Sequence, residues 1–168
     1  MRPGRALDIA DAFEARFGQR PEGLYVVGSR AEAYTTGKWP EGSGPNTSDI
    51  DLVIQSDVPD VTKWTPEGFQ FLRDINPGKV PPGITAVGVG PNEALIGSGP
   101  GAIPKAGLVD PFVGPAGELP DLSLGPAIKV YPLPPVPPAL FSAAAGPLAT
   151  VLWQWVREST AQTVPLSQ

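Results

Sequence analysis

Proline and glycine are the residues that most restrict how this chain can fold. The chain has 23 prolines and 20 glycines among its 168 residues, and most of them lie after residue 76. Proline interrupts helices and central strands, and glycine weakens both. We therefore expect an ordered front half and a loop-rich region over residues 76–138. A chain of this length is cramped for two domains, so residues 1–168 should form one.

Hydrophobic spacing and turn residues predict the regular elements between these breaks. Helices and strands alternate along the front half, which indicates an α+β or α/β sheet with helices on one side. Of these two we expect the α+β class, with a small mixed sheet and helices packed on one side. Thr65-Pro66 has the pattern of a helix start, with threonine as cap and proline at the first helical position. The predicted helices cover residues 5–17, 66–75 and 141–158, and residues 29–33 should form the first turns of a further helix. The predicted strands cover 24–27, 49–55, 84–89, 107–113 and 127–131.

Composition removes several kinds of chemistry. The chain has no cysteine and no histidine, which excludes disulfides, Cys/His zinc sites, thiol nucleophiles and imidazole bases. A bound metal would need oxygen ligands, which suit Mg²⁺ or Mn²⁺. The formal net charge of −5 argues against a broad grip on a nucleic-acid backbone, although a small substrate could still be held locally.

Two segments bear on membranes and export. The first residues contain no apolar run, so we expect no signal peptide. Residues 138–156 are uncharged and approach the length of a membrane span,. Gly146-Pro147 interrupts this stretch, and alanine rather than leucine dominates it. We therefore expect a buried terminal helix and no membrane partner.

Two acids lie two residues apart on a predicted strand. Asp49 and Asp51 should point to the same face of that strand, and the apolar residues between and after them to the other. Two adjacent carboxylates repel each other unless a cation lies between them, and a divalent metal meets that need. The alternative is a solvated strand face that carries two acids by chance.

A strand-to-helix turn precedes these acids. The apolar residues 25–27 run directly into Gly28-Ser29, and Ser29 should open a helix whose free N–H groups form a natural phosphate site. The alternative for Ser29 is a capping box with Glu32, which needs no ligand. The two interpretations are compatible, because a capped helix can still receive a phosphate.

Together, Gly28-Ser29-Arg30-Ala31 and Ser48-Asp49-Ile50-Asp51-Leu52 resemble the DNA polymerase beta-type nucleotidyltransferase superfamily. The local form is most similar to the minimal bacterial nucleotidyltransferases, and similar domains occur at the toxic ends of polymorphic toxins. The resemblance covers residues 5–56, about a third of the chain. It implies a nucleotidyltransferase-like fold for the sheet described above.

The chain departs from the family in two ways. Residues 37–46 lengthen the loop between the two motifs and have the character of an insertion. Family members also carry a third carboxylate on a later strand, and none is obvious here. Asp110 has suitable apolar surroundings, although Pro111 directly after it suits an edge better than the middle of a sheet. Asp121 and Glu93 are the alternatives.

The resemblance implies a mechanism and a set of site residues. Asp49, Asp51 and Asp110 would be both catalytic and metal-binding, holding two Mg²⁺ (or Mn²⁺) ions. Gly28 and Ser29 would bind the phosphates of an NTP, such as ATP. Arg30 would add a phosphate contact, with a solvated helix side chain as the alternative.

The resemblance leaves several functions open. The leading hypothesis is transfer of NMP from an NTP, with pyrophosphate release, to an RNA end such as tRNA or to a protein hydroxyl. As a bacterial toxin domain the chain would act in the cytoplasm after delivery and have an immunity or antitoxin partner. The alternatives are a catalytically inactive binding or antitoxin-like module and a proline-rich scaffold. Trp39 and Trp64 flank the predicted site and could stack on a base.

Overall fold

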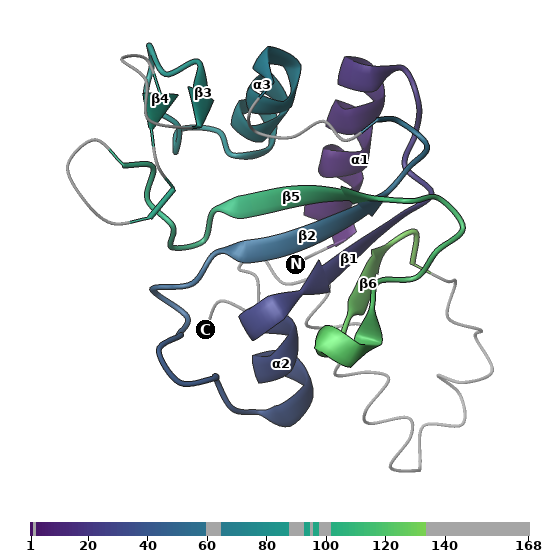
Figure 1. The fold of residues 1–168 in the computed structure, drawn as a ribbon, viewed down its shortest axis with the longest axis vertical. Helices are drawn as coiled ribbons and strands as arrows, with labels where there is room; N and C mark the ends of the chain where they lie inside the picture. Colours follow the sequence, from purple (N-terminus) through teal and green to yellow (C-terminus); the bar gives the residue numbers. More distant parts are fainter. Residues whose placement is uncertain (2, 60–64, 88–92, 95, 98–101, 134–168) are drawn as a thin grey trace.

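A four-stranded mixed sheet covered on one face by two helices forms the centre of the molecule (Figure 1). The computed structural model describes residues 1, 3–59, 65–87, 93–94, 96–97 and 102–133. The elements are α1 (Pro3–Phe17), β1 (Gly23–Val27), α2 (Gly28–Thr36), β2 (Ile50–Gln55), α3 (Pro66–Ile75), β3 (Ala86–Val87), β4 (Glu93–Ala94), β5 (Val109–Gly114), η1 (Leu122–Leu124) and β6 (Ile128–Tyr131).

The strand order in the main sheet is β5-β2-β1-β6. Strand β1 pairs antiparallel with both β2 and β6, whereas β2 pairs parallel with β5. The expected α+β class with a small mixed sheet is therefore confirmed. β5 is an edge strand, which explains how Pro111 is accommodated, because an edge strand needs backbone donors on one side alone.

The core lies between this sheet and helices α1 and α3. Alternate residues of β2 (Ile50, Leu52 and Ile54) are buried, as are Leu24 and Val26 of β1. They pack against a cluster from the helices that includes Phe13 and Phe71. Because side chains alternate along a strand, the residues between them, including Asp51 and Val53, belong to the opposite face of the sheet.

Helix α3 also contributes to a second, smaller core. Phe69 and Leu72 pack with Val80, Ile103 and Leu108 beside the short parallel pair β3 and β4. Thr65 caps α3 as predicted, its side chain accepting a hydrogen bond from the backbone N–H of Gly68, and Pro66 opens the helix. The sequence patterns had predicted a strand over 84–89 and a loop from residue 94. The described part of that strand is Ala86–Val87, which pairs with Glu93–Ala94 rather than joining the main sheet.

Helix α2 begins one residue earlier than predicted, at Gly28 rather than Ser29. It continues beyond the predicted first turns to Thr36, where Gly37 in the left-handed conformation (φ 77°) ends it. The predicted terminal helix at 141–158 lies outside the described residues, as does most of the proline-rich spacer before it. Within the described part of the chain, no helix has the combination of length and apolar character that crossing a bilayer requires.

Candidate functional site

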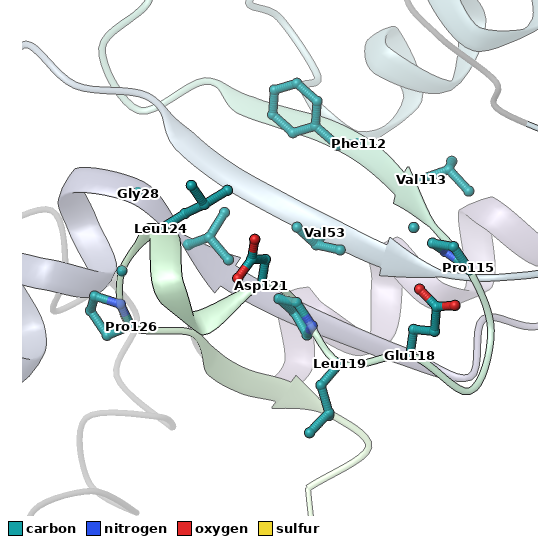
Figure 2. A pocket seen from close by; sticks show the side chains of 14 residues that line it. Gly28, Val53, Phe112, Val113, Pro115, Glu118, Leu119, Asp121, Leu124 and Pro126 are labelled. Carbon is teal, nitrogen blue, oxygen red and sulfur yellow. The ribbon is translucent and has the colours of Figure 1, made fainter.

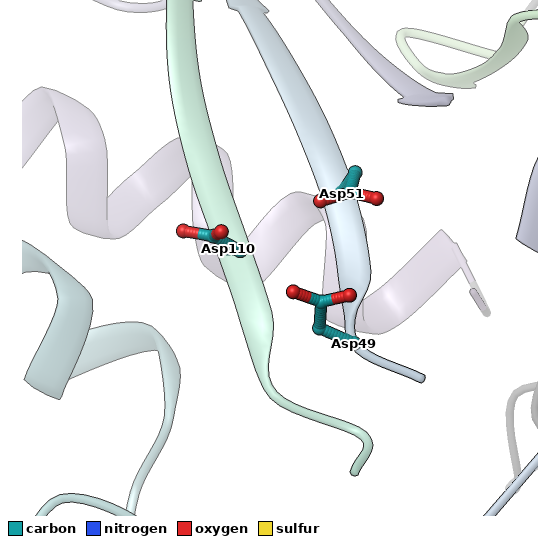
Figure 3. Close-up of side chains that lie close together, drawn as sticks. All are labelled: Asp49, Asp51 and Asp110. Atoms are coloured by element: carbon teal, nitrogen blue, oxygen red, sulfur yellow. The ribbon is translucent and has the colours of Figure 1, made fainter. Parts of the chain in front are cut away.

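Three carboxylates meet on the face of the sheet that α1 and α3 leave uncovered (Figure 3). Asp51 of β2 lies directly beside Asp110 of β5 in the parallel register, and Asp49 precedes Asp51 by two residues. One oxygen from each of the three lies within 4.8 Å of the other two. The structure therefore brings together the three acids that the resemblance had suggested.

The environment of these carboxylates suits a cation. Asp49 and Asp110 are buried, and Asp51 is half-buried. Burial raises the pKa of the Asp49 carboxyl, nearby Asp110 raises it further, and Lys105 opposes the shift from 3.7 Å away. Buried acids close together are costly when ionised, and a divalent cation bound by oxygen ligands would relieve that cost. The donor set therefore fits Mg²⁺ or Mn²⁺.

The predicted turn at Gly28 packs directly against the acid cluster. Gly28 has a φ of 72°, and a Cβ atom there would overlap the Oδ2 atom of Asp51. Both observations require glycine at this position. The close approach places the start of α2 beside the carboxylates, so a phosphate held by the helix N-terminus would lie near a cation held by Asp51.

The capping box predicted for Ser29 is wrong. The helix starts at Gly28, one residue before Ser29, so the N-cap position belongs to Val27. The hydrocarbon side chain of Val27 cannot make a capping hydrogen bond. Ser29 therefore lies within the first turn and is half-buried. The N-cap residue of α2 therefore contributes no side chain to the backbone donors of the first turn, and such donors at a helix start favour an anion.

Arg30 is fully buried, so the interpretation as a solvated side chain is also wrong. Its Nε donates to the carbonyl of Asp49 at 2.8 Å, and its Nη2 donates to the carbonyls of Ser48 at 2.5 Å and Pro45 at 3.3 Å. Its guanidinium lies 5.4 Å from the ring centroid of Trp39. Arg30 thus holds the backbone that carries Asp49, and Trp39 covers Arg30. The other tryptophan expected near the site, Trp64, lies outside the described residues.

A buried side chain also holds the strand that carries Asp110, and we call such a side chain, Arg30 or Asn76, a clamp. The sequence patterns did not reveal the clamp at Asn76. The side chain of Asn76 is fully buried. Its Nδ2 donates to the carbonyl of Val109 at 2.8 Å, and its Oδ1 accepts from the N–H of Val109 at 2.7 Å. Asn76 therefore pairs with the residue immediately before Asp110, although its sequence context indicates merely a helix end.

The two alternative acids lie elsewhere. Asp121 caps η1, its carboxylate accepting from the backbone N–H and hydroxyl of Ser123 at 2.9 and 2.6 Å. Glu93 belongs to β4, in the separate two-stranded sheet.

Comparisons of the chain with models of protein families, with curated proteins and with solved structures found no match. The case for a function therefore depends on the site itself.

Proposed function

We propose that this protein is a metal-dependent nucleotidyltransferase that transfers NMP from an NTP to a macromolecular acceptor. The observation that supports it most is the grouping of Asp49, Asp51 and Asp110 on adjacent strands, beside a helix start whose Gly28 packs against Asp51. A carboxylate cluster beside an anion site is the arrangement that binding a metal–triphosphate complex requires.

Each part of the site would have a distinct role. The three carboxylates would hold Mg²⁺ or Mn²⁺, which when bound neutralises the charge of the phosphates. Gly28, Ser29 and the N-terminus of α2 would bind the distal phosphates through backbone N–H groups. Arg30, which the resemblance had assigned to a phosphate, makes its described hydrogen bonds to backbone carbonyls. We assign it the role of positioning Asp49.

The reaction exchanges one phosphate ester for another. The acceptor oxygen would form a bond to the α-phosphorus, the bond from the α-phosphorus to the bridging oxygen would break, and pyrophosphate would leave. The acceptor hydroxyl loses its proton in this exchange. Both an RNA end, such as that of tRNA, and a protein hydroxyl provide such an oxygen, and an acidic toxin domain with an immunity protein is a setting that fits either acceptor.

The alternative of an inactive binding or antitoxin-like module would have gained support from the lack of a third carboxylate. An oxygen of Asp110 lies within 4.8 Å of an oxygen of each of the other two acids, which supports Asp110 as the third ligand, so no observation at the site favours the inactive module. The proline-rich scaffold leaves the convergence of the acids and Gly28 unexplained.

Two differently labelled nucleotides test the proposal. The full chain is incubated with Mg²⁺, a bacterial extract and each NTP, labelled with ³²P either at the α-phosphate or at the γ-phosphate. Nucleotidyl transfer places the α-label on RNA or protein and leaves the γ-label in pyrophosphate. Labelling of a macromolecule by γ-³²P would instead indicate a kinase, and no labelling by any nucleotide would favour the binding module.

A pair of variants tests whether the labelling depends on the acid cluster. Asp51→Asn should abolish labelling, since it removes one ligand charge from the cluster with little change in shape. Asp57→Asn is the matched control, because Asp57 is an exposed acid shortly after the same strand and should leave labelling unchanged. Equal labelling by the wild type and Asp51→Asn would overturn the metal assignment.

A further inference from the structure

A cavity lies on the face of the sheet that α1 and α3 leave uncovered (Figure 2). It has a volume of about 510 Å³ and lies between β2, β5 and the segment 115–126. Val53 and Phe112 line it from the strands, and Leu119 and Leu124 line it from the segment. A volume of this size is in the range of small-molecule sites.

The wall of the cavity is held in place by hydrogen bonds to the sheet. The N–H of Gly117 donates to the Glu22 carboxylate at 2.8 Å, and the Gln55 side chain donates to the carbonyl of Glu118. Asp121 fixes the turn that presents Leu124, through its hydrogen bonds to Ser123. These contacts preform the cavity, so a ligand would not have to order this segment on binding.

The apolar lining is unusually exposed. Phe112 is 45% exposed, Leu119 69% and Leu124 87%. Of the five large apolar side chains that are exposed in the described residues, four lie between 112 and 124, and the fifth, Leu7, is on α1. Clustered exposed apolar side chains indicate a binding surface.

The cavity begins close to the carboxylates. Val53 follows Asp51 by two residues on β2, and Phe112 follows Asp110 by two residues on β5, a separation of about 7 Å along each strand. Gly28, which packs against Asp51, also lines the cavity. A ligand whose phosphates lie at the carboxylates could therefore reach the cavity with a group attached through one sugar.

The charge of the cavity determines whether the phosphates or the base of such a ligand would enter it. Glu118 and Asp121 line it, and no Lys or Arg is among the described residues that do so. Hydrogen bonds from Ser123 hold the pKa of Asp121 below its usual value, so it is ionised at neutral pH. Carboxylates repel phosphate but accept hydrogen bonds from N–H groups. An uncharged ring with N–H donors suits this lining.

We propose that this cavity binds the base of the nucleotide and favours bases that carry an amino group over uracil. This inference rests on the proposed function. The ring would pack against Phe112, Val53 and Leu124, and the amino group would face Glu118 and Asp121. Uracil offers one N–H donor between two carbonyl oxygens. The carboxylates would repel these two oxygens.

Calorimetric titration of the full chain separates the base from the phosphates. In Mg²⁺, the probes are inorganic tripolyphosphate and the α,β-methylene analogues of ATP and UTP, which cannot undergo transfer. The ATP analogue should bind about tenfold more tightly than tripolyphosphate, as expected for stacking of one base. The UTP analogue should bind more weakly than the ATP analogue.

Three variants test whether the higher affinity for the ATP analogue than for tripolyphosphate comes from the cavity. Phe112→Ala and Leu124→Ser should bring the affinity for the ATP analogue close to that for tripolyphosphate and leave tripolyphosphate binding unchanged. Leu124 is so exposed that its replacement should not disturb folding. Leu7→Ser is the matched control, because Leu7 is 46% exposed on α1, and it should change neither affinity.

The outcomes distinguish this inference from the proposed function. Equal binding of tripolyphosphate and the ATP analogue, or an unchanged affinity in Leu124→Ser, would overturn the base site and leave the metal site standing. Binding of the ATP analogue that depends on Leu124 but not on Mg²⁺ would support the base site and contradict the metal site. A dimer that Leu124→Ser dissociates would overturn the inference, because a second copy would then cover the cavity.

Discussion

The two strands that carry the acids are held at their starts in different ways. At β2, the buried guanidinium of Arg30 donates to the carbonyls of Asp49, Ser48 and Pro45. At β5, the neutral amide of Asn76 forms a pair of hydrogen bonds with Val109. Backbone hydrogen bonds then join the two starts, from Ile50 N–H to the Leu108 carbonyl and from Gly107 N–H to the Ser48 carbonyl, at 2.7 and 3.0 Å.

The difference matters because one clamp is charged and the other is not. Burial lowers the pKa of Arg30, and the charges of Asp49 and Asp51 oppose that shift. Arg30 therefore compensates the carboxylates of β2 electrostatically as well as fixing their backbone. Asn76 fixes the position of Asp110 without changing its charge balance. Replacing Arg30 should consequently affect both folding and the electrostatics of the site, whereas replacing Asn76 should act through geometry.

The largest expected effect is that of Arg30→Met. It leaves three carbonyls without this donor and removes a buried positive charge, so the free energy of unfolding should fall by about 3–5 kcal/mol. Urea denaturation measures this change. Arg30→Lys keeps the charge but cannot make the same set of hydrogen bonds, and it should have an intermediate stability. A loss below about 1 kcal/mol in Arg30→Met would contradict the charged clamp.

Asn76→Ala should have the next largest effect. It leaves the buried N–H and carbonyl of Val109 without these partners, at a cost of about 2–3 kcal/mol. Mg²⁺ affinity, measured by calorimetry on the folded variant, should also fall because Asp110 loses its support. Asp74→Ala, in the last turn of the helix that Asn76 follows, is the matched control, since its ion pair with Arg16 is partly exposed and should contribute below about 1 kcal/mol. Unchanged Mg²⁺ affinity in Asn76→Ala would show that the clamp does not position Asp110.

A third test uses the raised pKa of Asp49. The unfolded chain loses this proton at a lower pH than the folded chain, so metal-free stability falls as pH rises from the ordinary aspartate value of about 3.9 through the raised value. Asp49→Asn removes this contribution, and its stability relative to the wild type in EDTA should increase over the same pH range. A constant difference between the two proteins would contradict the assigned pKa direction.

The same pair of proteins tests the metal. A divalent cation at ten times its dissociation constant should stabilise the wild type at pH 7 by about 1.4 kcal/mol. Thermal denaturation with Mg²⁺ and with EDTA measures this stabilisation. Asp49→Asn should show little of it, because one ligand charge is gone. Equal stabilisation of the two proteins would place the cation elsewhere.

The smallest expected effect is that of Lys105→Ala. Its Nζ lies 3.7 Å from the Asp49 carboxylate, and the Lys105 side chain is half exposed. Such a pair contributes about 0–1 kcal/mol, so stability should change little. Removing the lysine should strengthen Mg²⁺ binding a few-fold, because a competing cation is lost. Weaker Mg²⁺ binding in Lys105→Ala would indicate that Lys105 supports the site rather than competes with the metal.

Local patterns predicted the elements of the front half well. The strand at β2, the cap at Thr65 and the edge location that Pro111 favours all depend on interactions between near neighbours in sequence. The patterns failed where the local rule was incomplete. Ser29 and Glu32 match a capping box, but the turn at Gly28 starts the helix one residue earlier. The strand at 84–89 was placed correctly in part, but no local signal showed that it pairs with Glu93–Ala94.

The sequence by itself determined which chemistry is available. Without histidine or cysteine, any metal that the chain binds must have oxygen ligands, and the spacing of Asp49 and Asp51 on a strand puts both on one face. The tertiary structure decided which third acid joins them, because the parallel pairing of β2 with β5 places Asp110 beside Asp51. It also decided that Arg30 and Asn76 are clamps, since hydrogen bonds across 15 to 33 residues leave no trace in local sequence.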